Sequence, residues 1–289
     1  MNIKMTLNDM SEKQTYREVL MGASSFLSSI EKEAFAAEWL LRERFDLTKT
    51  DLIRRYPATM EPVVKEQYLS DLKAFANGLP VQYIIGHEWF YDRKFKVTSD
   101  TLIPRPETEE WFDRYLKRLS NRPLKVLDVG TGTGVLAISH KLQRPQDEVT
   151  AVDISPEAIA VAQENAARLQ AEVAFLQSDL TQAVQTDQYD LIISNPPYIS
   201  YEEQADMDES VLEHEPKLAL FAEEDGLAIY RRLAEELPAR VKPKARILME
   251  IGFRQGHSVK DLFSSAFQEA DVEVWKDMAG HDRVVYVAT

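Results

Sequence analysis

The chain has 289 residues, no cysteine, and a net charge of −14 from 34 basic and 48 acidic residues. The absence of cysteine excludes disulfides and thiolate metal sites, and the acidic balance argues against a protein that wraps nucleic acid, because such proteins neutralise phosphates. No signal-peptide pattern opens the sequence and no apolar run approaches the ~20 residues of a membrane helix, so we expect a cytoplasmic protein without membrane contacts. The five histidines show no ligand spacing, which predicts that no metal is bound.

The first part of the chain, residues 1–80, predicts a small helical domain. Apolar residues recur at helical spacing between Val19 and Leu40, and prolines and a Gly-Leu-Pro sequence at 78–80 interrupt the segment. We interpret Trp39 as part of its core. Residues 81–105 are rich in aromatic and β-branched residues on both sides of the polar sequence Asp92-Arg93-Lys94, which predicts a β-hairpin linker. A helix should begin near Thr108.

The remainder, residues 106–289, alternates between strand and helix patterns. We expect strands at 124–130, 149–153, 173–176, 189–194, 246–251, 272–275 and 284–287, and helices at 135–142, 156–169, 227–237 and 259–267. This alternation predicts an α/β domain with a Rossmann-like, mostly parallel sheet covered by helices on both faces. The last two strands are joined only by the turn around Gly280 and should be antiparallel.

A glycine-rich turn follows the first of these strands. It consists of Gly130, Thr131, Gly132, Thr133 and Gly134, and its glycines allow a ligand to approach the backbone closely. Val135 stands where the dinucleotide fingerprint requires glycine, so the turn fits NAD poorly. The alternative interpretation is a tight strand-to-helix turn without a ligand.

Acidic residues end the next two strands. Asp153 is placed to accept hydrogen bonds from both ribose hydroxyls, and Asp179, followed by Leu180, to accept one from an adenine amino group. Together with the glycine-rich turn they predict an adenosine site. The alternatives are an N-cap role for Asp153 and a simple turn role for Asp179.

The most specific short motif is Asn195-Pro196-Pro197-Tyr198, at the end of the strand predicted at 189–194. A planar amide or amino nitrogen is a poor nucleophile because its lone pair is delocalised, and it reacts better when both of its hydrogens are held by acceptors. The side-chain oxygen of Asn195 and the carbonyl of Pro196 can supply these acceptors, and the prolines stiffen the turn. Tyr198 can pack on a flat substrate group. The motif therefore indicates methylation of a planar nitrogen, and the alternative is a rigid Pro-Pro turn.

Over residues 80–289 the sequence resembles the protein-(glutamine-N5) methyltransferases that act on class 1 peptide chain release factors. The resemblance rests on the glycine-rich and Asn-Pro-Pro-Tyr motifs and on more specific segments, namely Gln82 to Gly86, Phe95 to Val97, Ile103-Pro104-Arg105-Pro106-Glu107-Thr108-Glu109, Asp153 to Ser155, Glu215-Pro216 with Ala219 to Phe221, Glu250 to Gly252, and Asp282 to Val285. It implies a class I methyltransferase fold, S-adenosylmethionine as donor, and the glutamine of a Gly-Gly-Gln loop as acceptor.

By the same resemblance, residues 130–134, Asp153, Asp179, Leu180 and Asn195 would line the donor, Asn195 to Tyr198 would bind the glutamine amide, and the turn with Arg105 and Pro106 would wall the site. The helical domain would grip the release factor, and we expect a monomer without direct nucleic acid contacts. Two positions depart from the family, since His214 and Leu180 stand where aromatic residues are common. We interpret Glu213-His214-Glu215 as a loop that closes over the site, and Arg283 as a partner of an acidic residue.

Two alternatives stay open. The Asn-Pro-Pro-Tyr chemistry also suits a DNA or RNA adenine-N6 methyltransferase that flips a base into its pocket, although the net charge of −14 argues against it. A donor-binding adaptor that acts by protein contact alone would not need the amide clamp around Asn195, and its function would survive substitution of that residue.

Overall fold

The computed structural model describes residues 14–289, so the first 13 residues of the predicted N-terminal domain lie outside the described part. The chain divides into two compact units. Of the described residues, unit 1 contains 14–86 and Glu209–His214, and unit 2 contains His87–Asp208 and Glu215–Thr289.

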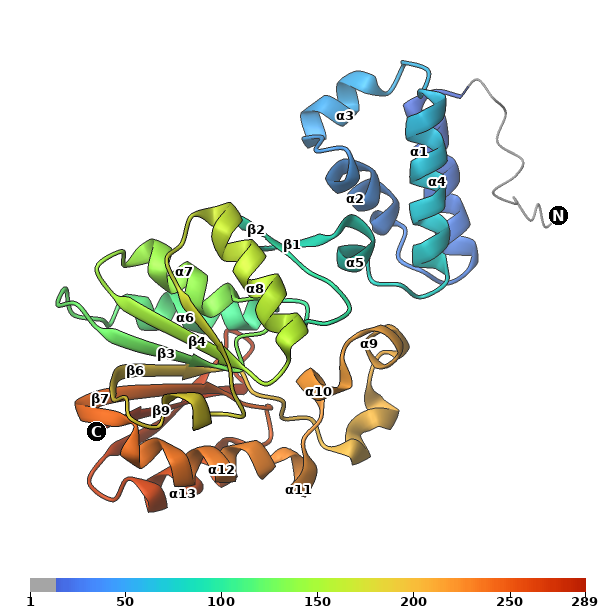
Figure 1. Cartoon of the computed structure of the whole chain (residues 1–289). Coiled ribbons are helices and arrows are strands. Elements are labelled where there is room, and N and C mark those ends of the chain that lie inside the picture. Colours follow the sequence, from blue (N-terminus) through green and yellow to red (C-terminus); the bar gives the residue numbers. More distant parts are fainter. Residues whose placement is uncertain (1–13) are drawn as a thin grey trace. The chain divides into compact units, whose positions relative to one another are not determined.

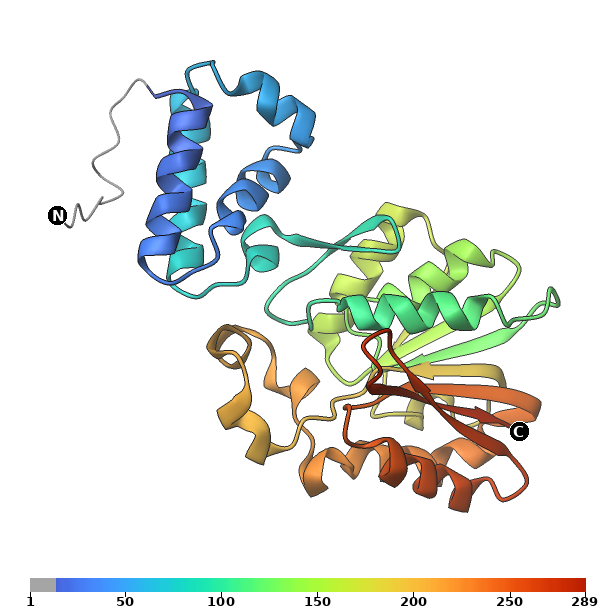
Figure 2. The same ribbon diagram turned by 180° about the vertical axis from the view of Figure 1, so that it is seen from behind.

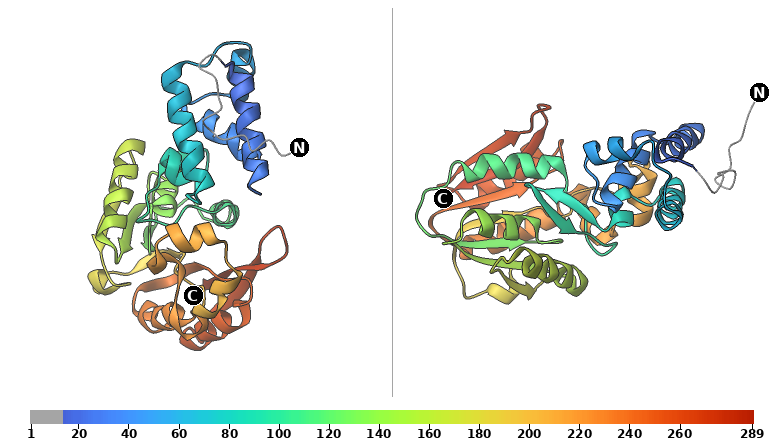
Figure 3. Two further views of the ribbon diagram at one scale, coloured as in Figure 1. Left: turned by 90° about the vertical axis from the view of Figure 1, so that its right-hand side faces the viewer. Right: turned by 90° about the horizontal axis from the view of Figure 1, so that it is seen from above.

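Unit 1 is helical. It comprises α1 (Tyr16–Ser29), α2 (Phe35–Arg44), α3 (Lys49–Arg55), α4 (Pro62–Ala76), α5 (Val81–Ile85) and the separate α9 (Glu209–His214). Thr15 and Thr48 begin α1 and α3 with capping boxes. Helices α1 and α4 lie side by side (Figure 3), and the buried Tyr68 of α4 donates a hydrogen bond to the carbonyl of Ala37 at 2.9 Å. Trp39 packs against this core, as predicted.

The predicted β-hairpin is shorter than expected, because residues 81–85 form a helix. The paired strands are β1 (His87–Phe90) and β2 (Arg93–Lys96). Pro80 stands at the N-cap of α5, and Gly86 ends the helix in the left-handed conformation with φ of +81°. These start and stop signals, together with burial of Val81 in the core of unit 1, outweigh the β-propensity of the segment.

Unit 2 contains a seven-stranded sheet in the order β5-β4-β3-β6-β7-β9-β8. The strands are β3 (Lys125–Val129), β4 (Glu148–Asp153), β5 (Ala174–Gln177), β6 (Tyr189–Ser194), β7 (Val241–Glu250), β8 (Asp271–Lys276) and β9 (Asp282–Ala288). Strands β3 to β7 pair in parallel, and β9 is antiparallel to both β7 and β8. The predicted α/β class and the antiparallel terminal pair are therefore confirmed. Strand β7 begins five residues earlier than predicted.

Helices cover both faces of this sheet (Figures 1 and 2). On one face lie α6 (Pro106–Leu116), α7 (Val135–Gln143) and α8 (Pro156–Leu169), and on the other α12 (Ala228–Glu236) and α13 (Gly256–Ala266). Helix α6 begins two residues before the predicted start, since proline is favoured in the first turn. Short helices α10 (Lys217–Leu220) and α11 (Glu223–Gly226) connect β6 to α12. All six residues of β6 are buried, which fixes the central strand between two apolar layers.

A buried polar cluster lies under α7 and holds one of the histidines. The His140 side chain contacts the Tyr115 hydroxyl at 2.5 Å and the Asp147 carboxylate at 2.8 Å, and Arg144 donates to the same carboxylate. Burial lowers the pKa of His140. Among residues 14–289 no group of three or more His, Cys, Asp or Glu side chains is placed to hold a metal ion. None of the described helices is long and apolar enough to span a membrane.

Candidate active site

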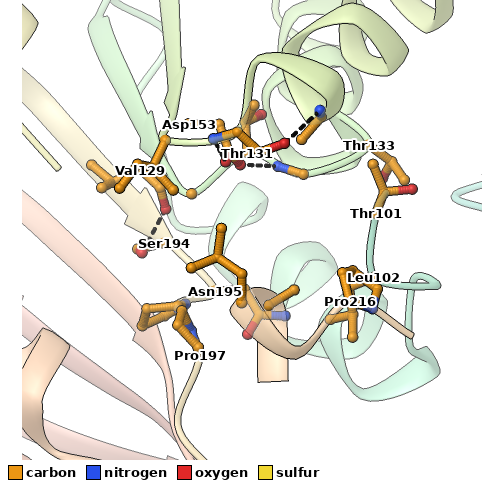
Figure 4. A pocket seen from close by; sticks show the side chains of 18 of the residues that line it. Thr101, Leu102, Val129, Thr131, Thr133, Asp153, Ser194, Asn195, Pro197 and Pro216 are labelled. Atoms are coloured by element: carbon orange, nitrogen blue, oxygen red, sulfur yellow. Dashed lines mark hydrogen bonds between the residues drawn. The ribbon is translucent and has the colours of Figure 1, made fainter. Parts of the chain in front are cut away.

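A cavity of about 450 Å³ opens in unit 2 where the parallel strands end. Val129 of β3, Asp153 of β4, Ser178 after β5 and Ser194 of β6 all line it, so it lies at the carboxyl edge of the sheet (Figure 4). The structure brings eleven of the predicted site residues to this cavity: Arg105, Gly130, Thr131, Gly132, Thr133, Asp153, Asp179, Leu180, Asn195, Pro196 and Pro197. Pro106, Gly134 and Tyr198 are not among the lining residues.

The glycine-rich turn forms one wall. Gly130 and Gly132 have φ of +75° and +55°, a conformation that side chains rarely adopt. The backbone N–H groups of Gly130 and Thr131 both donate to the carbonyl of Val152, at 2.9 and 3.0 Å, which holds the turn against β4. Gly134 caps α7 and faces the protein interior, since an added Cβ would lie 2.7 Å from Ile138 Cδ1.

Asp153 connects this turn to the end of β4. Its carboxylate accepts hydrogen bonds from the N–H groups of Gly132 at 2.8 Å and Ser155 at 3.0 Å, one on each oxygen. Burial raises the pKa of Asp153, although these hydrogen bonds act to lower it. Ser155, and not Asp153, is the N-cap of α8, so the alternative N-cap interpretation of Asp153 is wrong. The lone pairs that these bonds leave free can accept from a ligand hydroxyl.

The cavity is also lined by Asp179, Leu180 and two residues of α12, Ile229 and Arg232. Arg232 donates to the Asp179 carboxylate at 2.9 Å. Leu180 has a φ of +47°, and its side chain packs against the core under α12. Helix α12 carries no recognisable binding motif, and this is why its two lining residues were not predicted.

The first three residues of the Asn-Pro-Pro-Tyr turn also line the cavity. Ser194 anchors it by donating to the carbonyl of Val129 at 2.7 Å, and the Asn195 side-chain nitrogen lies 3.4 Å from the Thr108 hydroxyl. Tyr198 packs against the core, and its carbonyl accepts a hydrogen bond from Gln255 at 2.9 Å. Burial raises the pKa of the Tyr198 hydroxyl, so it stays protonated at neutral pH.

Two buried glutamates hold the segments beside this turn. Glu215 accepts hydrogen bonds from the Ile103 N–H at 3.1 Å and from Arg105 at 2.6 Å. Glu215 therefore stabilises the cavity wall near Arg105 from the inside. The predicted closing loop of Glu213, His214 and Glu215 does not form as expected, because Glu213 and His214 belong to α9. Glu250, at the end of β7, accepts from Thr108 and Trp111 at 2.6 and 2.8 Å. Arg283 pairs with Asp277 at 3.1 Å, which confirms the structural interpretation of Arg283.

The cavity fits S-adenosylmethionine. Its volume lies within the ~300–1,000 Å³ typical of ligand pockets. The glycine-rich turn allows close approach of a ligand to the backbone, and Asp153 offers a carboxylate to ribose hydroxyls. The fold and this site together define a class I S-adenosylmethionine-dependent methyltransferase.

Similarity to known proteins identifies the family to which the chain belongs within this class. Residues 114–218 match the methyltransferase small domain, and residues 18–86 match the PrmC N-terminal domain. The chain is 44% identical over 269 residues to the release factor glutamine methyltransferase of Enterococcus faecalis, covering 93% of this chain and 97% of the relative. The corresponding Bacillus subtilis enzyme is 42% identical over 282 residues, covering 94% and 97%. The chain belongs to the release factor glutamine methyltransferase family.

A solved methyltransferase from Pyrococcus furiosus is similar in fold. It has a TM-score of 0.53 and 18% identity, and the likeness covers 78% of this chain and 96% of that structure. At this identity the likeness concerns the fold alone.

Proposed function

We propose that this chain transfers the methyl group of S-adenosylmethionine to the side-chain amide nitrogen of the glutamine in the Gly-Gly-Gln motif of class 1 peptide chain release factors. The observation that carries the proposal is the position of Asn195 and Pro196 in the same cavity as the glycine-rich turn and Asp153. Family membership, with relatives named for this reaction at 42–44% identity, supports the choice of acceptor.

In this proposal the donor end of the cavity is formed by residues 130–133, Asp153, Asp179 and Leu180. S-adenosylmethionine would supply an electrophilic methyl group: its S–CH₃ bond would break as the N–CH₃ bond forms, S-adenosylhomocysteine would leave, and the methylated nitrogen would then lose one proton to water. Asn195 Oδ1 and the Pro196 carbonyl accept the two amide hydrogens of the substrate glutamine, which turns its nitrogen lone pair toward the methyl group. Orientation of this kind can contribute about 7–11 kcal/mol to lowering a barrier. Arg105 lines the part of the cavity that receives the substrate glutamine. Pro106 and Tyr198 do not line the cavity and support its walls from behind.

In the same proposal the helical domain, predicted at residues 1–80, binds the body of the release factor. Its match to the PrmC N-terminal domain supports a role particular to this family. We also expect the chain to act as a monomer without direct nucleic acid contacts. Size-exclusion chromatography with light scattering tests the first expectation, and competition of the methylation assay by duplex DNA and tRNA tests the second.

The experiment that tests the proposal measures transfer of labelled methyl to a purified release factor and to its Gly-Gly-Gln to Gly-Gly-Ala variant. We expect label on the normal factor alone, and no label on it when Asn195 is replaced by Ala. Incorporation into DNA or RNA, with none into either factor, would replace the proposal with the adenine-N6 reaction. Donor binding without any transfer would favour the adaptor.

A further inference from the structure

A chain of hydrogen bonds leads from the end of β7 to the Asn-Pro-Pro-Tyr turn. The Glu250 carboxylate oxygen Oε2 accepts from the Thr108 hydroxyl at 2.6 Å and from the Trp111 indole N–H at 2.8 Å. The Thr108 hydroxyl oxygen in turn lies 3.4 Å from Asn195 Nδ2. Thr108, Trp111 and Glu250 are each at most 3% exposed, so water does not compete for these bonds.

The donors and acceptors along this chain can be assigned from chemistry. An indole N–H can only donate, so Oε2 of Glu250 is an acceptor. The Thr108 hydroxyl has one hydrogen, which it donates to Oε2 of Glu250. The hydroxyl then presents only lone pairs to Asn195, which must approach with its NH₂ group. A reversed amide would place Oδ1 against a lone pair of the hydroxyl.

Glu250 is itself held in place from several sides. The indole of Trp111 fixes its carboxylate, and the Tyr230 hydroxyl donates to its backbone carbonyl at 2.6 Å. Burial raises the pKa of Glu250, whereas the hydrogen bonds from Thr108 and Trp111 and the charge of Arg283 act in the opposite direction. A buried carboxylate with two donors is thus available to direct the hydroxyl of Thr108.

We propose that Glu250, acting through Thr108, sets the orientation of the Asn195 amide so that Oδ1 is turned away from α6 and is available to the acceptor nitrogen. Glu250 and Thr108 are positioning residues, and of these three residues it is Asn195 that binds the substrate amide. This inference rests on the proposed function, because it concerns the same amide clamp. It adds that the amide-binding residue Asn195, which follows β6, depends on the hydroxyl of Thr108 and on the carboxylate of Glu250 at the end of β7.

A matched pair of variants tests the proposal. Thr108→Ser keeps the hydroxyl, and Thr108→Val keeps the shape of the side chain but removes the hydroxyl. Steady-state methylation of a release factor gives kcat and KM, and calorimetric titration with S-adenosylhomocysteine gives donor affinity, both at a temperature at which the variants are folded by circular dichroism. We expect the Ser variant to keep kcat within about three-fold, and the Val variant to lose about ten-fold to a hundred-fold in kcat with unchanged donor affinity.

Trp111→Phe serves as a second test, because it removes one donor to Glu250 and leaves the Thr108 hydroxyl in place. We expect a smaller loss of kcat than in Thr108→Val. Equal kcat in the Ser and Val variants, or a loss of donor affinity that matches the loss of kcat, would overturn the positioning role. If the wild-type chain methylates no acceptor, both the proposed function and this inference are overturned. If the wild type is active and the Ser and Val variants have equal kcat, only the inference is overturned.

Discussion

The carboxylate of Asp153 accepts a hydrogen bond from the backbone N–H of Gly132 at 2.8 Å. This bond joins the end of β4 to the turn after β3, so the glycine-rich loop and the acidic strand end form one continuous wall of the cavity (Figure 4). A change at Asp153 therefore affects both a direct ligand contact and the shape of the turn.

Replacing Asp153 by Asn should weaken binding of S-adenosylhomocysteine by about ten-fold or more. The amide NH₂ would face a backbone N–H of Gly132 or Ser155, and one acceptor for the ribose hydroxyls would be lost. Isothermal titration calorimetry measures the affinity. Asp261→Asn is the control, because Asp261 lies on α13 with its side chain 64% exposed. An unchanged affinity in the Asp153 variant would exclude this carboxylate from donor binding.

The second prediction compares the stability effects of alanine substitutions at Gly132 and Gly134. Both glycines have a positive φ, but the space around them differs. An added Cβ at Gly134 would lie 2.7 Å from Ile138 Cδ1 and 3.1 Å from Ala162 Cβ, whereas at Gly132 it would meet nothing within 4 Å. Gly132→Ala should cost about 1–2 kcal/mol of unfolding free energy from backbone strain, and Gly134→Ala about 1–3 kcal/mol more from overpacking. Urea unfolding followed by circular dichroism measures both. Equal losses would show that packing at Gly134 adds nothing.

The local signals in the sequence predicted the strands and their ends well, because motif residues sit at the carboxyl ends of parallel strands, where topology brings them together. Asp153, Asp179 and Asn195 reach one cavity for this reason. Segment 81–85 was predicted as part of the hairpin because its composition favours strand, and only the flanking proline and glycine indicate the short helix.

The supporting residues of the site could not be found in this way. Thr108 and Glu250 are 142 positions apart, and Ile103 and Glu215 are 112 apart. Neither partner in these pairs carries a local signature, and each pairing depends on where α6 and the segment before it pack on the sheet. The family resemblance includes all four residues, but which of them pair with one another emerges only from the fold.

Arg232 should contribute to donor affinity. None of the described residues that line the cavity is aromatic, and the planar guanidinium of Arg232, held by Asp179 at 2.9 Å, is suited to lie on an adenine ring. We expect Arg232→Ala to weaken S-adenosylhomocysteine binding about five-fold. Arg231 is the matched control, since it neighbours Arg232 on α12, is not among the lining residues and pairs with Glu224 at 2.7 Å. Equal affinities of the two variants would contradict the assignment.

Asp128 should make the stability of the fold depend on pH. Its side chain is fully buried in β3, and burial raises the pKa of the carboxyl to about 7, although Thr131 and Ala137 donate to it. In the unfolded chain an aspartate titrates near ~3.9, so between pH ~4 and about 7 the folded state holds a proton that the unfolded state has lost. The contribution of Asp128 to the free energy of unfolding therefore falls as pH rises through this window.

Asp128→Asn removes this titration while keeping the shape of the side chain. Urea unfolding of the wild type and the variant at pH 4.5, 6.0 and 7.5 should show the stability of the wild type, relative to the variant, decreasing with each increase in pH. The comparison between the two proteins cancels the general effect of the acidic surface. Asp271→Asn, at an exposed position that begins β8, should show a nearly constant difference from the wild type. A relative stability of Asp128→Asn that stays constant, or that changes in the opposite direction, would show that Asp128 is already ionised in the folded protein at low pH, and that the polar contacts of Thr131 and Ala137 dominate over burial.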